Sequence, residues 1–316
     1  MSPSRTSDFS YDLPEQAIAQ SAVEPRDAAR LLDADALTDH RFADLPALLN
    51  PGDLVVVNRT RVRRARLLGH RENGGKVEAL LLGPLGDSRW EALVRPARRL
   101  RQGDRLTFGG IRAKVAEDPI AGKAVLHLEA PDAEAAIAAT GTMPLPPYFK
   151  GSLDDDERYQ TVFADRLGSA AAPTAGLHFT GELFDALAIG GVQRAFVDLE
   201  IGLDTFRPIS SETLEGHAMH TEKYRVDEEA AAAVADTRRR GGEIVAIGTT
   251  VVRALESAAA QSGQVTPSEG ATDLFITPGR PFRAVDRLVT NFHVPGSTLV
   301  VLVAAFMGDR WRDAYS

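Results

Sequence analysis

The hydrophobic pattern of the chain changes period partway along, and this change limits the possible folds more than any other feature. Between about Val62 and Met143, short apolar segments are separated by Gly-Gly, Gly-Asp and Asp-Pro turn signals. Such a pattern is typical of antiparallel strands. The expected strands are Lys76–Leu82, Trp90–Val94, Arg105–Phe108, Ile111–Ala116 and Ala124–Glu129. Five or six strands at this spacing predict a small antiparallel β-barrel or sandwich.

Outside this region, strands alternate with helices. Asp53–Asn58 has central apolar residues without alternation, which is typical of a strand buried on both faces. Further strands are expected at Ala195–Ile201, Glu243–Gly248 and Arg287–Phe292. Helices are expected after the capping residues Thr180, Asp227 and Ser297 and from about Thr250. The alternation predicts an α/β fold whose mostly parallel sheet is covered on both faces, a three-layer sandwich.

Together, the two patterns predict a discontinuous domain with an insertion. We expect 1–61 and 144–316 to form the α/β domain that carries the active site. We expect 62–143 to form an inserted antiparallel β-barrel domain. A chain of 316 residues is long enough for two domains of ordinary size.

The composition excludes several classes of chemistry. The chain has no cysteine, so disulfides, thiolate zinc sites, iron–sulfur clusters and cysteine nucleophiles are ruled out. Its formal net charge of -8 argues against a protein that coats nucleic acid through bulk electrostatics. Residues 61–142 nevertheless hold 15 Lys and Arg against 10 Asp and Glu. This local surplus is either a solvated barrel surface or a patch that faces phosphate groups.

The sequence contains no membrane or secretion signal. No apolar stretch follows a basic start, and the longest apolar run, Leu299–Met307, is far below the roughly 20 residues of a transmembrane helix. We therefore expect a cytoplasmic protein without a membrane partner. We also expect a monomer.

Three polar segments occupy junctions where an open α/β sheet binds its ligands. Gly248-Thr-Thr250 leads from a strand into a helix, and its N–H groups and hydroxyls suit a carboxylate, unless the threonines only cap the helix. Asn291-Phe-His293 ends another strand, and its histidine is either structural or functional. The third segment, Ala171–Thr180, combines small residues with His178, which can exchange a proton near neutral pH.

Metal and nucleotide sites have little support. His217 and His220 lie close together in the sequence, so a zinc site is an alternative, but the helical H-E-x-x-H signature is absent. We expect no metal. The sequence also lacks a Walker loop and a G-x-G-x-x-G motif, so nucleoside triphosphate and dinucleotide chemistry are unsupported.

In combination, these segments resemble the S-adenosylmethionine:tRNA ribosyltransferase-isomerases of queuosine biosynthesis. The resemblance runs from Tyr11-Asp-Leu-Pro14 to Gly308. Its motifs are Asn58-x-Thr-Arg-Val62, Pro144-Leu-Pro-Pro-Tyr148, Arg158-Tyr-Gln-Thr161, Ala171-Ala-Pro-Thr-Ala-Gly-Leu-His-Phe179, Thr205-Phe-Arg-Pro208, Met219-His220, Gly248-Thr-Thr250 with Arg253 and Glu256-Ser257, Thr272-Asp273, and Thr290-Asn-Phe-His293 with Pro295 and Ser297-Thr298.

The resemblance implies an unusual use of S-adenosylmethionine as a co-substrate. Members of this family transfer and isomerise its ribosyl moiety onto 7-aminomethyl-7-deazaguanine in tRNA, which gives epoxyqueuosine-tRNA, adenine and methionine. The sulfonium acidifies the C5′ hydrogens, so a protein base, an acid for adenine and a dry pocket would suffice without metal. The implied fold is an α/β sandwich with an inserted β-barrel.

The resemblance also implies site residues. The expected catalytic residues are His178, His220, Glu200 and Asp273. The expected S-adenosylmethionine contacts are Thr174, Ala175, Gly176, Phe179, Gly248, Thr249, Thr250, Arg253, Asn291 and His293. The expected substrate-binding residues are Asn58, Arg61, Tyr148, Tyr159, Gln160 and Arg207, together with Arg98 and Arg99 from the positively charged segment 61–142.

The chain departs from the family pattern near the implied acceptor end. Arg59 replaces a usual Asp, and Glu200-Ile-Gly-Leu-Asp204-Thr-Phe206 stands where His-x-Gly-x-Gly-Thr-Phe is usual. The sequence also ends at Ser316, where relatives usually continue. Two alternatives to the tRNA enzyme follow: the same donor chemistry on a small-molecule amine, or a catalytically silent RNA-binding paralogue.

Overall fold

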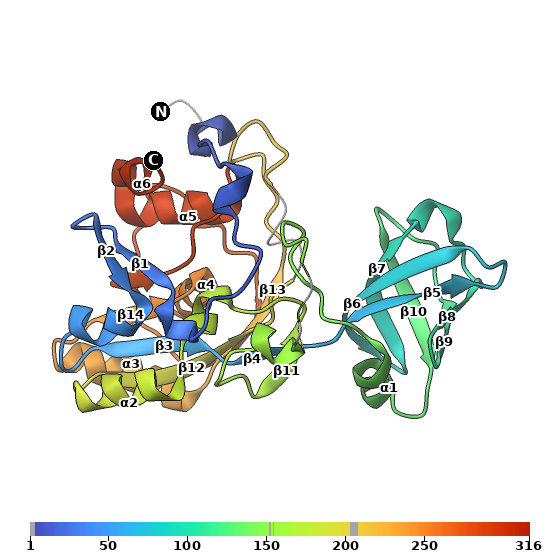
Figure 1. The fold of residues 1–316 in the computed structure, drawn as a ribbon, viewed down its shortest axis with the longest axis horizontal. Helices are drawn as coiled ribbons and strands as arrows, with labels where there is room; N and C mark the ends of the chain where they lie inside the picture. The colour runs from blue at the N-terminus through green and yellow to red at the C-terminus, as the bar shows by residue number, and fades with distance from the viewer. Residues whose placement is uncertain (1–3, 152, 154, 203–207) are drawn as a thin grey trace. The chain divides into compact units, whose positions relative to one another are not determined.

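The computed structural model describes residues 4–151, 153, 155–202 and 208–316, and it divides into two compact units (Figure 1). The first comprises Met1–Arg61, Pro146–Arg166 and Ala172–Ser316, and the second comprises Val62–Leu145 and Leu167–Ala171. The second unit thus ends two residues beyond the expected insertion. It also includes Leu167–Ala171, which the sequence pattern places in the other domain.

The first unit is built on a six-stranded mixed sheet. Its order is β15 (Ser268–Thr272), β13 (Glu222–Val226), β12 (Gln193–Leu199), β3 (Leu54–Asn58), β14 (Ile244–Ile247) and β16 (Arg287–Val289). The sheet is parallel from β12 to β16, and β13 and β15 join it antiparallel. The α/β class is confirmed, with an antiparallel edge that the apolar pattern did not predict.

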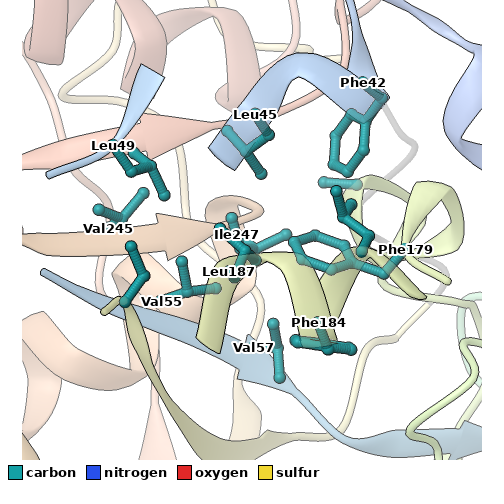
Figure 2. Packing of buried hydrophobic residues seen from close by; sticks show 13 residues of the cluster. Phe42, Leu45, Leu49, Val55, Val57, Phe179, Phe184, Leu187, Val245 and Ile247 are labelled. Carbon is teal, nitrogen blue, oxygen red and sulfur yellow. The ribbon is translucent and has the colours of Figure 1, made fainter. Parts of the chain in front are cut away.

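Helices cover both faces of this sheet, and the strand β3 in its middle is buried on both faces. All five residues of β3 are buried. On one face, Val55 and Val57 pack in a cluster with side chains of α2 (Gly181–Ile189) and of the 3-10 helix η4 (Phe42–Leu48) (Figure 2). Strand side chains alternate between faces, so Leu54 and Val56 point the other way. The helices α3 (Glu228–Arg239) and α4 (Thr249–Ala258) contact β3, β12 and β14 there.

Side-chain caps begin three helices of this unit where the sequence predicts them. Thr180, Asp227 and Ser297 each accept a hydrogen bond from the backbone N–H three residues later. The last of these caps α5 (Thr298–Met307). Because capping requires only local chain geometry, it can be predicted from sequence. Among the residues that the structure describes, no helix is long and apolar enough to cross a membrane.

The second unit is a closed antiparallel barrel with strand order β10-β7-β6-β5-β8-β9. Its strands are β5 (Arg66–Arg71), β6 (Lys76–Gly86), β7 (Arg89–Arg95), β8 (Arg105–Phe108), β9 (Ile111–Val115) and β10 (Lys123–Glu129). Buried and exposed residues alternate along β8 and β9, as expected for a barrel wall. The five expected strands are confirmed, and β5 was missed because arginines at both ends obscure its short apolar pattern.

Shorter elements complete the two units. The remaining strands are β1 (Arg30–Asp33) paired with β2 (Thr38–Arg41), and β4 (Thr60–Val62) paired with β11 (Arg166–Ser169). The remaining helices are α1 (Ala133–Thr140), α6 (Trp311–Ala314), η1 (Thr6–Phe9), η2 (Glu15–Ala17), η3 (Arg26–Ala28), η5 (Ala97–Arg99), η6 (Asp156–Tyr159), η7 (Thr174–His178) and η9 (Gly308–Arg310).

Candidate active site

Three loops meet beyond the carboxyl ends of β14 and β16. These strands are parallel neighbours, and the Gly248 N–H donates to the Val289 carbonyl at 2.7 Å. The Thr174 hydroxyl donates to Asn291 Oδ1 at 2.8 Å, which joins the loop after β16 to η7. A Cβ placed on Gly248 would lie 3.7 Å from the Ala175 Cβ. The three junctions that the sequence singles out are therefore in contact.

Gly248 makes the turn from β14 into α4 possible. Its φ of +92° lies in a region that L side chains rarely adopt, which explains glycine here. It is the N-cap residue of α4, and no side chain caps this helix. The suggestion that the threonines cap the helix is therefore wrong, since Thr249 and Thr250 lie inside its first turn. The first N–H groups of a helix have no partner within it, so this end suits an anion.

His178 lies at the end of η7, beside this junction. Its ring centroid is 5.2 Å from that of Phe42, and its Nε2 is 3.5 Å from Asn291 Nδ2. Burial is the main cause that lowers the pKa of His178 below its usual value. A hydrogen bond with the Arg26 backbone opposes this shift, and the charges of Arg158 and Arg26 reinforce it. The imidazole is therefore neutral at pH 7 and able to accept a proton.

His293 is held by the protein on both sides of its ring. Nε2 lies 3.2 Å from the Thr290 hydroxyl, and Nδ1 lies 3.2 Å from the hydroxyl of Tyr315. The Tyr11 hydroxyl donates to the His293 carbonyl at 2.5 Å. Burial lowers the pKa of His293 to about 4. These contacts fix the loop after β16.

A second polar cluster joins α4 to β13. The Arg253 guanidinium donates to the Glu222 carboxylate and to the carbonyls of Leu274 and Thr272. The Nε2 atom of His220 lies 3.3 Å from Glu222 Oε1. Arg253, expected to contact the co-substrate, is buried in this network. His220 is one of the expected catalytic residues, whereas the sequence patterns did not single out Glu222.

The alternation of residues along β13 could have drawn attention to Glu222. Along β13 the residues alternate between buried and exposed positions, and Glu222 shares the buried face with Val226. Burial by itself would raise the pKa of Glu222, but hydrogen bonds from His220 and the Gly202 N–H, with the charge of Arg253, lower it. An acid on the apolar face of a strand needs such partners, so its position predicts a specific network.

Asn58 at the end of β3 links neighbouring elements. Its Nδ2 donates to the Leu199 carbonyl at 2.9 Å and to the Thr250 hydroxyl at 3.4 Å. Its Oδ1 accepts from the N–H groups of Leu199 and Thr60, both at 3.2 Å. The side chain is buried, so its bonds to β12 and α4 explain why an amide ends this strand.

The two expected catalytic acids lie on different segments. Glu200 is half-buried just after β12, and its N–H donates to the Lys223 carbonyl at 2.9 Å. Asp273 is exposed just after β15. Among the described residues, no group of three or more His, Cys, Asp or Glu is arranged to hold a metal ion.

The expected substrate-binding residues have different environments. Arg61 pairs with Glu157, and Tyr159 and Gln160 are buried. Burial raises the pKa of Tyr148, which is half-buried. Arg98 and Arg99 are exposed on η5 of the barrel unit. Arg207 and Asp204 lie outside the described residues.

Arg59, the departure beside Asn58, lies in an ion-pair network of the first unit. Its Nε is 3.1 Å from Asp198 Oδ1, and its Nη2 is 2.9 Å from Asp227 Oδ2. Arg166 also pairs with Asp198 at 3.0 Å. This arginine therefore balances acids around the cap of α3.

Comparisons with known proteins agree with this architecture. The family model described as queuosine biosynthesis protein matches residues 6–316. The S-adenosylmethionine:tRNA ribosyltransferase-isomerase of Symbiobacterium thermophilum is 51% identical, over 96% of this chain and 92% of the relative. That of Acetivibrio thermocellus is 46% identical, over 99% and 94%. The crystal structure of S-adenosylmethionine tRNA ribosyltransferase from Thermotoga maritima is 35% identical, with a TM-score of 0.53, over 98% and 93%. The chain belongs to the queuosine biosynthesis protein family.

Proposed function

We propose that the protein is an S-adenosylmethionine-dependent ribosyltransferase-isomerase. It transfers and isomerises the ribosyl moiety of S-adenosylmethionine onto 7-aminomethyl-7-deazaguanine in tRNA, giving epoxyqueuosine-tRNA, adenine and methionine. Relatives about half identical to this chain carry the name of this activity. The structural observation that carries the proposal is the meeting of the Thr174–His178, Gly248–Thr250 and Asn291–His293 segments beyond the parallel strands.

The co-substrate would bind where these segments meet. The uncapped N-terminus of α4 suits the carboxylate of the methionyl part, because its first N–H groups point outward along the helix axis. Ala175 and Gly176 are small and buried, and they let the backbone of η7 approach a ligand closely. Thr174 and Asn291, which hydrogen-bond to each other, form the adjoining wall.

The chemistry needs a base and an acid. The base removes a C5′ proton next to the sulfonium, and the acid gives a proton to adenine as its bond to C1′ breaks. The amine nitrogen of the acceptor loses a proton and forms a C–N bond to a carbon of the ribosyl group. The electron pair left at C5′ by deprotonation forms a new bond within that group, and the C5′–S bond breaks as methionine leaves with its electron pair. His178 suits the base because burial keeps its ring neutral. His220, beside the Glu222 carboxylate, suits the group that carries a proton.

The barrel would contribute phosphate contacts. Arg98 and Arg99 are exposed and belong to the segment with surplus positive charge. Exposed arginines of this kind suit the backbone of a folded RNA. Because its acceptor is tRNA, we place the protein in the cytoplasm.

A single assay tests the proposed function. The protein is incubated with S-adenosylmethionine and tRNA that bears 7-aminomethyl-7-deazaguanine, and the nucleosides are analysed by mass spectrometry. Epoxyqueuosine is expected only when both substrates are present. Adenine release without any tRNA, stimulated instead by small amines, would support the small-acceptor alternative. Binding of tRNA with no adenine release would support the silent paralogue.

A further inference from the structure

Glu222 is a buried carboxylate on which three segments converge. Its Oε1 accepts from the Gly202 N–H at 2.9 Å and lies 3.3 Å from His220 Nε2. Its Oε2 accepts from Nη1 of Arg253. The Glu222 side chain is 2% exposed and that of Arg253 4% exposed. A charge this deeply buried is costly unless every oxygen is matched by a donor, so the arrangement constrains each partner.

On the Oε2 side, Arg253 is held in place by further hydrogen bonds. Arg253 also donates to the Thr272 carbonyl at 3.1 Å and to the Leu274 carbonyl at 3.2 Å. The guanidinium can only donate hydrogen bonds, so the atom of residue 222 that faces it must be an acceptor. The carboxylate therefore cannot turn away from Arg253 without leaving a buried cation unpaired.

The other carboxylate oxygen, Oε1 of Glu222, determines which nitrogen of His220 carries a hydrogen. Glu222 stays ionised because of the hydrogen bonds that its carboxylate accepts and the charge of Arg253. An ionised carboxylate only accepts hydrogen bonds. The facing nitrogen of the imidazole must then carry the hydrogen. In a neutral imidazole the other nitrogen is the acceptor.

We propose that Glu222 is a positioning residue that keeps a hydrogen on Nε2 of His220, so that whenever the imidazole is neutral it is the Nε2–H tautomer with Nδ1 as the acceptor nitrogen. The ring is thereby oriented so that Nδ1 receives a proton and returns it. The same carboxylate also accepts the hydrogen bond from the N–H of Gly202, which lies two residues after the expected catalytic Glu200. The catalytic consequence rests on the proposed function, whereas the tautomer does not.

The substitution Glu222→Gln gives a specific test because it exchanges one acceptor for a donor. Arg253 requires the amide oxygen on its own side, so the amide NH₂ group must face His220. That group donates, so the imidazole must face it with an Nε2 that carries no hydrogen. The hydrogen bond from the Gly202 N–H to Oε1 is lost in the variant. We expect the tautomer of His220 to invert from Nε2–H to Nδ1–H.

The tautomer is read from the ring ¹⁵N signals of protein labelled in histidine, recorded at pH 9, where an ordinary histidine is neutral. The signals of His220 are identified among the seven histidines by their loss in His220→Gln. The matched control is Glu269→Gln, the same change on the neighbouring strand β15 at an exposed side chain. This control is expected to leave the His220 signals unchanged.

Measuring both the His220 tautomer and turnover distinguishes a failure of the positioning role from a failure of the proposed function. Acid–base catalysis is typically worth about 10²–10⁴-fold, so Glu222→Gln is expected to lower kcat by about 10²-fold without changing the Kd for S-adenosylmethionine. An Nδ1–H tautomer in the unaltered protein overturns the proposal even if the variant does not fold. An unchanged tautomer in folded Glu222→Gln also overturns it. Inversion in a protein that makes no epoxyqueuosine would support the positioning and reject the function.

Discussion

The hydroxyl of Thr174 donates to Asn291 Oδ1 at 2.8 Å, across 117 residues of sequence. This bond joins η7 to the loop after β16 and brings the Asn291 amide toward His178. Neither residue lies on a regular strand, so their contact depends on the sheet beneath them. The candidate site is held together by such bonds between loops.

We predict that Thr174→Val weakens S-adenosylmethionine binding by about 2- to 12-fold, because one hydrogen bond contributes about 0.5–1.5 kcal/mol. Valine keeps the shape of threonine but cannot donate to Asn291. Calorimetry measures the effect. Thr142→Val removes a hydroxyl that donates to the Arg66 carbonyl in the barrel unit, and it is the matched control. Equal affinities for the two variants would argue against S-adenosylmethionine binding where the three loops meet.

Gly248→Ala is expected to destabilise the first unit by about 1–3 kcal/mol and to weaken co-substrate binding. The cause is the backbone, since φ is +92° while the new Cβ would meet Ala175 at an ordinary 3.7 Å. Urea unfolding gives the first quantity and calorimetry the second. Gly270→Ala, where a Cβ meets nothing within 4 Å, is the control. A Gly248→Ala protein as stable as this control would contradict the prediction.

The pH dependence of turnover should report His178 as the base. Burial lowers the pKa of His178, so its neutral form persists below the usual 6.5. We expect kcat/KM to be level near pH 7 and to fall at acidic pH, below 6.5. His178→Gln should lower the plateau by about 10²–10⁴-fold. His127→Gln, at an exposed barrel position, is the control, and an acidic limb above pH 6.5 would count against this assignment.

His293 should make the stability of the first unit depend on pH. Its pKa is lowered to about 4 in the folded protein, against 6.5 when unfolded, so its contribution is complete above pH 6.5 and is lost as pH falls toward 4. Between pH 7 and 5 the free energy of unfolding should drop by about 2 kcal/mol through this residue. His293→Gln should remove that part of the drop.

Urea unfolding at pH 7 and at pH 5 measures this drop in the free energy of unfolding. The unfolding is monitored by the fluorescence of Trp311 in a Trp90→Phe background. This background leaves one tryptophan, in the unit that holds His293. His127→Gln should retain the full drop. If His293→Gln retained it as well, another group would be responsible.

Neutralising the exposed arginines of the barrel should weaken tRNA binding in a salt-dependent way. Each lost phosphate contact reduces the slope of log affinity against log salt by about 0.9 on duplex and about 0.7 on single strands. We therefore expect Arg98→Ala and Arg99→Ala each to flatten the slope. Arg112→Ala removes an arginine paired with Glu129 on the same unit and serves as the control. Affinity indifferent to salt and to both substitutions would reject this surface.

Local patterns in the sequence were sufficient to predict much of the fold. The caps at Thr180, Asp227 and Ser297, the continuous apolar strand β3 and the alternating barrel strands depend on residues close together in the chain. Polar residues at strand ends predicted the three loops of the candidate site. Each of these signals reflects backbone geometry and burial within one element, which neighbouring residues largely determine.

Only the tertiary structure decided how the polar side chains are paired. Glu222 lies on a strand rich in charge, and nothing near it in sequence indicates that Arg253 of α4 neutralises it. Thr174 and Asn291 likewise meet only because β14 and β16 are neighbours. Such pairs are specific to the packing of distant elements, because buried charge and hydrogen-bonding groups are stable only where another segment supplies the matching atom.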